Sequence, residues 1–339
     1  MKNGQLWVKN LASKYTSGVA HEFILHSGVN DYIDNTNDLK SFLSQFLGGR
    51  DLICFYNRAE GITFPLESMR NLFIEKLGLE KPSPTDPSFA ALLDSEEEEK
   101  TEEVLLPRSP AQALPLLEKA LKLDSKTAII MDFTEMLVPE GDISAMSSED
   151  RDNLILLQRW ARDPTIMSKG NLVILTTRNL SDIHSNLRAA SSRIEAIAIP
   201  LPTYEERLNY IKFIRKEEDE GMKDNEFARA TAGLGKIHIE DIKLRAEELG
   251  HPVTYELVRE RKEDIIRSEF ADVIEILEPT FGFELIGGME VIKSFFLKNI
   301  IRPLKEKNVK RAPMGVLLTG PPGTGKTAIV QAAAKESGV

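Results

Sequence analysis

The sequence Gly320-Pro321-Pro322-Gly323-Thr324-Gly325-Lys326-Thr327 decides which fold the C-terminal part of the chain adopts. An apolar run over residues 314–319 comes directly before it. An alanine-rich run over residues 328–335, with strong helix propensity, comes directly after it. This order predicts a strand, a glycine-rich loop and a helix.

Each fixed position of the loop has a physical task in holding a polyphosphate. Gly320, Gly323 and Gly325 lack a Cβ atom, so the backbone can turn tightly and direct its N–H groups at phosphate oxygens. Lys326 is placed to reach the β- and γ-phosphates, and the Thr327 hydroxyl is placed to ligate Mg²⁺ at the positive end of the helix. A chance glycine turn is the alternative, and the strand and helix on either side argue against it.

The proline pair and Thr324 make this loop similar to the Walker A loop of the AAA ATPase family. Residues 283–293 resemble the segment that opens an AAA module, and this resemblance implies that Ile286 and Gly287 border the adenine of ATP. Modules of the family continue through a Walker B strand, a sensor strand, an arginine finger and a helical lid. Because only 12 residues follow Thr327, we expect the module to be cut off here.

Length and composition are those of a globular protein with room for two domains. The chain has 339 residues, of which 42% are hydrophobic and 28% charged. A formal net charge of −10 disfavours broad attraction to nucleic acid or to an anionic membrane surface. No apolar window has the length of a transmembrane helix. We expect a cytoplasmic protein whose single cysteine, Cys54, is a buried free thiol.

The part before the glycine-rich loop resembles a first, degenerate AAA module. We expect an N-terminal extension over residues 1–50, with a short strand at 22–26, and then a large α/β domain over residues 51–202. The proline-containing, acidic interval 81–108 is expected to be an exposed loop.

A second strand, loop and helix order occurs near the start of this domain. Residues 51–56 form an apolar run, and the pattern at residues 66–77 is helical. The loop between them, residues 57–64, has one glycine, no lysine before Thr63 and a carboxylate at Glu60 that repels phosphate. We therefore expect no working phosphate site in this loop.

Residues 127–132 form an apolar strand that ends in Asp132 and resembles a Walker B strand, whose Asp orders the Mg²⁺ shell. Phe133 stands where the family has the Glu that polarises the attacking water. Hydrolysis in this module is therefore expected to be crippled. An Asp that merely ends a parallel strand is the alternative reading.

Two further features resemble AAA motifs. The strand at residues 171–176 resembles the sensor 1 strand, with Asn179 or Thr177 in the polar position. Arg193 is the best match to the arginine finger and Arg188 the second, although an ordinary surface arginine explains Arg193 equally well. By the resemblance, such a finger serves the site of a neighbouring subunit.

Residues 203–277 are charged and helical in pattern and resemble the small α-helical lid of an AAA module. Lys236 stands near the sensor 2 position of the lid, and its role is left open. Residues 278–339 then begin the second module, with a helix expected from Met289 to about residue 307.

The sequence thus predicts an α/β fold with a P-loop NTPase-like parallel sheet, flanking helices and a helical lid, followed by the start of a second AAA module. The resemblance implies an ATP- and Mg²⁺-binding fragment of an ATPase that remodels a protein partner in a homo-oligomeric ring of six subunits. A non-catalytic pseudo-ATPase scaffold is the alternative. Without a Walker B Glu, a sensor 1 and a finger for its intact loop, the chain alone is not expected to turn over ATP efficiently.

Overall fold

The computed structural model describes residues 6–79, 104–215, 221–270, 279–305, 313 and 315–337. The chain divides into a first unit, residues 1–262, and a second unit, residues 263–339. Most of the loop expected at 81–108 lies outside the described residues. Within the described ranges, no helix combines the length and the apolar character needed to cross a bilayer.

The first unit is built on a six-stranded sheet in the order β3-β2-β4-β5-β1-β6. Every neighbouring pair is parallel except β2 and β3, which are antiparallel. The central strands β4 and β5 are buried at every position, which is why their sequences are continuous apolar runs. The strands are β1 Glu22–Ser27, β2 Leu52–Asn57, β3 Gly61–Thr63, β4 Thr127–Met131, β5 Leu172–Thr176 and β6 Ile194–Ile199.

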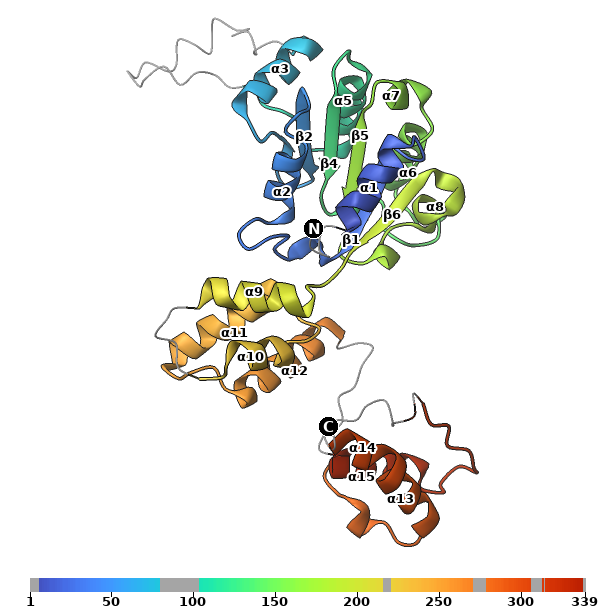
Figure 1. Cartoon of the computed structure of the whole chain (residues 1–339). Helices are drawn as coiled ribbons and strands as arrows, with labels where there is room; N and C mark the ends of the chain where they lie inside the picture. The colour runs from blue at the N-terminus through green and yellow to red at the C-terminus, as the bar shows by residue number, and fades with distance from the viewer. Residues whose placement is uncertain are drawn as a thin grey trace, which may run out of the picture. The chain divides into compact units, whose positions relative to one another are not determined.

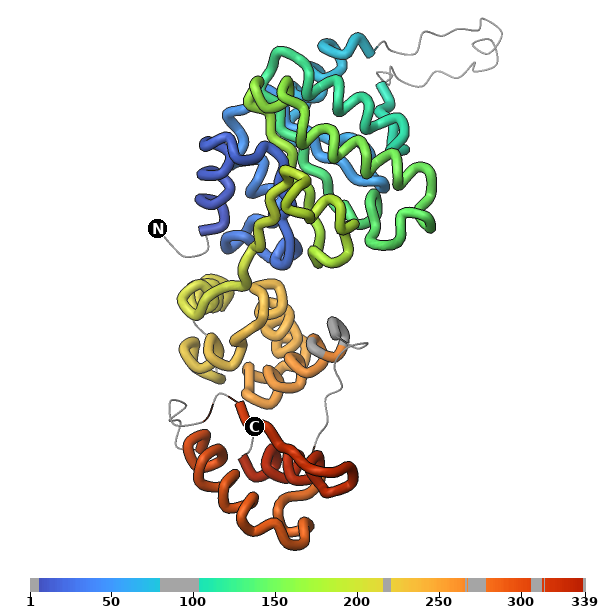
Figure 2. Tube along the Cα trace, turned by 90° about the vertical axis from the view of Figure 1, so that its right-hand side faces the viewer, coloured from blue at the N-terminus to red at the C-terminus, as the bar shows by residue number. Residues whose placement is uncertain are grey.

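Helices cover both faces of this sheet. Figures 1 and 2 show α1 on one face and α5 and α6 on the opposite face. The helices of this part are α1 Leu6–Thr16, α2 Leu39–Phe46, α3 Glu67–Leu77, α5 Pro110–Lys122, α6 Ser148–Trp160, α7 Pro164–Ser168 and α8 Ser185–Arg188. The parallel α/β fold predicted from the sequence is thus confirmed.

Helix ends follow the local sequence. The Ser147 side chain accepts a hydrogen bond from the Asp150 N–H and so caps the first turn of α6. Gly78 adopts a left-handed conformation directly after α3, as expected for a glycine that ends a helix.

The expected separation of residues 1–50 from the α/β domain needs correction. Strand β1 was predicted correctly, but it pairs with β5 on one side and β6 on the other, so it belongs to the interior of the sheet. Trp7 and Leu11 of α1 are buried in the same hydrophobic core as the strands. The polar residues Glu22 and His26 at the ends of β1 make the strand look peripheral in the sequence.

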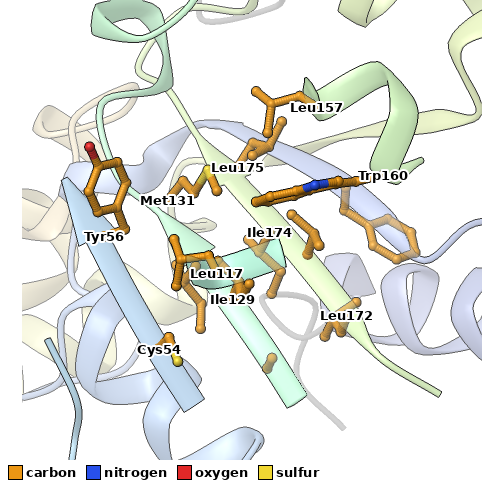
Figure 3. Packing of buried hydrophobic residues seen from close by; sticks show 14 of the residues in the cluster. Cys54, Tyr56, Leu117, Ile129, Met131, Leu157, Trp160, Leu172, Ile174 and Leu175 are labelled. Carbon is orange, nitrogen blue, oxygen red and sulfur yellow. The ribbon is translucent and has the colours of Figure 1, made fainter. Parts of the chain in front are cut away.

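The core of the first unit joins α6 to the central strands. Figure 3 shows Trp160 and Leu157 of α6 beside Ile174 and Leu175 of β5. Cys54 of β2 is fully buried as a free thiol, as predicted, and burial raises the pKa of this thiol. A neutral thiol of this kind acts as a small apolar side chain rather than as a nucleophile.

A group of helices follows the sheet where the helical lid is expected. A capping box between Thr203 and Glu206 begins the first of them. Tyr210, Phe227 and Ile242 are buried within this group. Its helices are α9 Tyr204–Ile214, α10 Asp224–Ala230, α11 Lys236–Leu249 and α12 Tyr255–Phe270.

The second unit consists of helices around a small core. Its members are α13 Glu290–Phe296, a π-helical segment Leu297–Ile301, α14 Arg302–Lys305 and α15 Lys326–Ser337. The predicted strand at 314–319 is wrong, because the described residues 315–319 form no strand and Leu317 is 87% exposed. A strand exists only through hydrogen bonds to a neighbouring strand, and the described part of this unit contains none.

Candidate functional site

The glycine-rich loop of the second unit leads directly into α15, as the sequence predicts. Gly323 and Gly325 have φ angles of 79° and 78°, which glycine adopts without strain. A Cβ atom on Gly325 would also lie 3.1 Å from the Cε atom of Met289. The backbone angle therefore favours glycine at position 325, and a larger residue would also have to displace the end of the Met289 side chain.

The ammonium group of Lys326 lies against its own loop. It donates hydrogen bonds to the carbonyl oxygens of Gly320, at 2.8 Å, and Pro321. The Thr324 hydroxyl donates to the Pro321 carbonyl at 2.9 Å and so tightens the same turn. The cation is thereby placed at the first turn of α15, where the free N–H groups of a helix already favour an anion.

The segment expected to border adenine lies beside this loop. Ile286 and Met289 pack against the small core that includes Ile329 of α15. The Ile286 carbonyl accepts a hydrogen bond from Lys293 Nζ at 2.6 Å, which fixes the turn before α13. Gly287 is exposed, with no described atom within 4 Å of where its Cβ would stand.

The loop fits a magnesium nucleotide in its chemistry. Residues 320–327 contain three glycines, one lysine and no carboxylate, so backbone N–H groups and a single cation face a polyphosphate without repulsion. Thr327 is exposed and carries a hydroxyl oxygen, which is a kind of ligand that Mg²⁺ accepts. One protein ligand is compatible with Mg²⁺, which keeps several waters and uses the phosphates as further ligands.

The first unit has a cleft of about 350 Å³ at the carboxyl ends of its parallel strands. Ligands of open α/β sheets bind at this edge. Residues from the loop after β1, from α2 and from the ends of β2, β4 and β5 line the cleft. The polar and charged ones are Asn30, Asp38, Lys40, Asn57, Glu60, Asp132, Glu135, Thr176, Thr177 and Arg178.

The cleft is unsuited to a polyphosphate because four of these side chains are carboxylates and two are cations. The Asp132 carboxylate accepts a hydrogen bond from the Thr176 hydroxyl at 2.9 Å. Burial is the main cause that raises the pKa of Asp132, and Glu60 and Asp38 act in the same direction, whereas Thr176 and Lys40 oppose them. The Lys40 ammonium also forms an ion pair with the Glu60 carboxylate, at 3.4 Å.

The loop after β1, residues 28–38, leads into a helix that starts with the same kinds of side chains as the helix after the glycine-rich loop. The first turn of α2 carries Lys40 and Ser41, a lysine and hydroxyl pair like Lys326 and Thr327. Residues 57–64, which follow the strand, loop and helix order in the sequence, contain the antiparallel edge strand β3 instead of a phosphate-binding loop. The Lys-Ser pair at a helix start was the signal that could have found the right loop.

The two sensor candidates lie at different places. Thr177 is buried at the end of β5 and lines the cleft, where its hydroxyl donates to the Asn179 carbonyl at 3.1 Å. The Asn179 amide turns to Asp182 and donates to its carboxylate at 3.0 Å. Phe133, next to Asp132, is 58% exposed and has a φ angle of 55°, an uncommon conformation for a bulky residue.

The two arginine candidates also differ. Arg193 is exposed and comes directly before β6, so it lies at the amino edge of the parallel sheet, opposite the edge that carries Asp132. It cannot reach the cleft of its own subunit. Arg188 is held by the Ile183 carbonyl and by an ion pair with Glu140, both at 2.8 Å.

Three family models match the chain. The N-terminal Rossmann-like domain of AAA+ chaperones matches residues 5–200, and the second helical domain of AAA+ chaperones matches residues 205–271. The model of the ATPase family associated with various cellular activities (AAA) matches residues 316–339. The first match alone covers more than half of the chain.

Relatives share parts of this chain. A cell division cycle protein 48 homolog of Archaeoglobus fulgidus is 25% identical over 67% of this chain and 34% of its own length. A proteasome-activating nucleotidase of Methanothermobacter thermautotrophicus is 39% identical over 22% of this chain and 20% of its own length. Fidgetin-like protein 1 of Drosophila melanogaster is 48% identical over 16% of this chain and 12% of its own length.

The chain thus spans about a third or less of the length of these relatives. The matching family models are those of AAA+ chaperones and of AAA ATPases. They also place a nucleotide-binding family signature at the glycine-rich loop, the part of the chain whose geometry suits a polyphosphate. Together with the α/β sheet and the helical group after it, they show that the chain belongs to the AAA+ chaperone family of ATPases.

Proposed function

We propose that residues 320–327 bind Mg-ATP, with Lys326 on the β- and γ-phosphates, Thr327 on Mg²⁺, and Ile286 and Gly287 beside the adenine. The position of the Lys326 ammonium carries this proposal, because it lies at a glycine-rich turn that leads into the positive end of α15. A phosphate oxygen that approaches this turn replaces the carbonyl oxygens that Lys326 now contacts.

We propose a different role for the first unit, as a partner module that does not hydrolyse ATP. Its cleft holds four carboxylates, and Phe133 replaces the residue that would polarise water. Asp132 is then a remnant of a metal-binding position, and Asn179 has no water to place. Arg193 remains available at the opposite edge of the sheet for the site of a neighbouring subunit.

For the whole protein, we propose a cytoplasmic, homo-oligomeric ring, hexameric by family resemblance, that couples ATP hydrolysis to the remodelling of a protein partner. The names of the relatives support this, since one is a proteasome-activating nucleotidase and another a cell division cycle protein 48 homolog. In this proposal the second module supplies the hydrolysis, and neither nucleic acid nor a membrane is the substrate.

Titration calorimetry with Mg-ATP tests the binding site on this chain. Lys326→Ala removes at least one charge-assisted hydrogen bond to phosphate, worth roughly 1.5–3 kcal/mol, so we expect binding to weaken by a factor of about 10 to 100 or more. Circular dichroism of both proteins checks that the variant is folded.

Lys40→Ala is the matched control, because Lys40 stands in the first turn of α2 as Lys326 stands in the first turn of α15. We expect Mg-ATP to bind this variant as it binds the original chain. Binding that survives Lys326→Ala and is lost in Lys40→Ala would move the site to the first unit. A folded chain that binds no nucleotide would support the scaffold alternative.

A further inference from the structure

The loop after β1 and the start of α11 are joined by two reciprocal sets of hydrogen bonds, each from a charged side chain to the backbone of the other segment. The Asp31 carboxylate accepts hydrogen bonds from the backbone N–H groups of Lys236, at 2.9 Å, and Ile237, at 3.0 Å. These are N–H groups of the first helical turn, which have no partner within the helix. A carboxylate here gains both the hydrogen bonds and the favourable end of the helix dipole.

The Lys236 side chain makes the reverse contact. Its ammonium donates to the carbonyl oxygens of Tyr32, Ile33 and Asp34 at 3.1, 3.2 and 2.9 Å. These three bonds use all three donors of the group, and Lys236 is only 6% exposed. Since a buried ammonium without these acceptors is costly, the loop and the helix hold each other in place.

Neighbouring contacts strengthen the same junction. The Tyr32 ring lies 6.1 Å from the ring of Tyr210 on α9, and its hydroxyl is hydrogen-bonded to Glu240 on α11, which raises the pKa of Tyr32. Gly235 is needed directly before α11, because a Cβ atom there would lie 2.9 Å from the Asp31 carboxylate.

The loop itself is held in shape from within. Asp34 accepts hydrogen bonds from the backbone N–H groups of Thr36, at 2.9 Å, and Asn37, at 2.8 Å. These hydrogen bonds fix the turn, so the carbonyl groups of residues 32–34 are already oriented toward the Lys236 ammonium.

We propose that Asp31 and residues 32–34, together with Lys236 and Ile237, form a latch that holds the helices after β6 against the sheet without any ligand. The loop after β1 lies at the ligand-binding edge of the sheet, and a helix N-terminus is a ready anion site. In the first unit these two elements bind each other, and Asp31 supplies the negative charge that a phosphate would bring. The first unit therefore keeps one arrangement of sheet and lid through a nucleotide cycle. The latch itself does not depend on ATP binding in the second unit and is tested by Lys236→Met alone, whereas its constancy through a nucleotide cycle rests on that proposed function.

Hydrogen exchange of the whole chain, followed by mass spectrometry with and without saturating Mg-ATP, tests the latch. We expect slow exchange at residues 236 and 237 that Mg-ATP leaves unchanged. In Lys236→Met the exchange at residues 31–38 and at the start of α11 is expected to rise about tenfold or more, while β4 stays protected. Protection at the latch that appears only with Mg-ATP would overturn the proposal.

Lys243→Met is the matched control, since Lys243 lies on the same helix and is 8% exposed, and its ammonium pairs with Glu247 at 2.8 Å rather than with the loop. We expect no faster exchange at residues 31–38 in this variant. Equal opening in both variants would show general loosening of α11 and sink the latch. If Lys236→Met does not fold, Asp31→Asn gives the same test with a milder change, and unchanged exchange there would also contradict the proposal.

Discussion

Two loops of this chain lead into helices that start with a lysine and a hydroxyl residue, but the loops differ in charge and glycine content. Residues 28–38 lead into α2 with Lys40 and Ser41, and residues 320–325 lead into α15 with Lys326 and Thr327. The first loop contains one glycine and three aspartates, whereas the second contains three glycines and no acid. We therefore expect a lysine and a hydroxyl at a helix start to be insufficient for phosphate binding, since the charges of the preceding loop also act on the phosphate.

The partner of each loop explains the difference. In the second unit, Lys326 satisfies the carbonyls of its own turn, and these contacts can be exchanged for phosphate oxygens. In the first unit, Asp31 already occupies the N-terminus of α11, and Lys40 is engaged by Glu60. In our proposals, an internal carboxylate takes the place of a ligand in the first unit, whereas the turn of the second unit stays open to a phosphate.

The largest expected effect is on the free energy of unfolding of the first unit. In our proposal this unit is held together by its own side chains and not by a nucleotide, so replacing a buried carboxyl group should change its stability. Glu22 of β1 is fully buried, and neither oxygen has a hydrogen-bond partner among the residues that the structure describes. We expect Glu22→Met to raise the free energy of unfolding by roughly 3 kcal/mol at neutral pH, the upper end for an unsatisfied buried group. Both tryptophans, Trp7 and Trp160, lie in this unit, so their fluorescence during urea unfolding measures it selectively.

The gain from Glu22→Met should depend on pH. Burial raises the pKa of Glu22 well above its ordinary value, so the unfolded chain loses this proton at a lower pH than the folded chain does. The original protein therefore loses stability as pH rises from the ordinary carboxyl pKa to the raised one, and the variant does not. A gain that is equal at pH 4 and pH 8 would contradict a buried, neutral Glu22. Glu195→Met on β6, whose carboxylate is half exposed in an ion pair with Lys14, should change stability by less than about 1 kcal/mol.

The second prediction compares two glycines of the phosphate loop. Both Gly325→Ala and Gly323→Ala force a side chain into the left-handed region, which costs about 1–2 kcal/mol. We expect the empty loop to relax out of this conformation, so that Mg-ATP has to restore it and binds more weakly by a factor of about 5 to 30. Only Gly325→Ala also crowds Met289, since the space beside Gly323 is open to 4 Å among the described atoms. Calorimetry should therefore rank Gly325→Ala as the weaker binder. Equal affinities would show that Met289 moves aside freely.

Much of the fold was predictable because its signals are local. The apolar runs predicted as strands at residues 127–132 and 171–176 form β4 and β5. Asp132 and Thr177 directly follow these two strands and line one cleft, because parallel strands end at the same edge of a sheet. The strand at 314–319 failed for the opposite reason, since a strand needs a partner that no local pattern reveals.

The latch and the acidity of the cleft were not predictable from the sequence. Asp31 and Lys236 are separated by 205 residues, and only the packing of α11 against the loop after β1 brings them together. Asp38, Glu60 and Asp132 belong to three different loops, so their charges add up only once the sheet is formed. The place of β1 in the sheet was missed for a similar reason. The sequence of β1 does not reveal that its partners are β5 and β6, which lie much later in the chain.

The smallest expected effect is that of Phe133→Glu on ATP hydrolysis, where we expect no change. Phe133→Glu restores the acidic pair after β4 that the family resemblance associates with hydrolysis, yet we expect no new ATP turnover. A water-polarising carboxylate acts only on a phosphate that is already held in place, and the four carboxylates of the cleft oppose that. The added charge would also raise the pKa of Asp132 further, because like charges disfavour ionisation. Phosphate release should be measured in Phe133→Glu with and without Lys326→Ala. Turnover that appears with the new glutamate and survives the loss of Lys326 would mean that the loop after β1 can hold phosphate despite its aspartates.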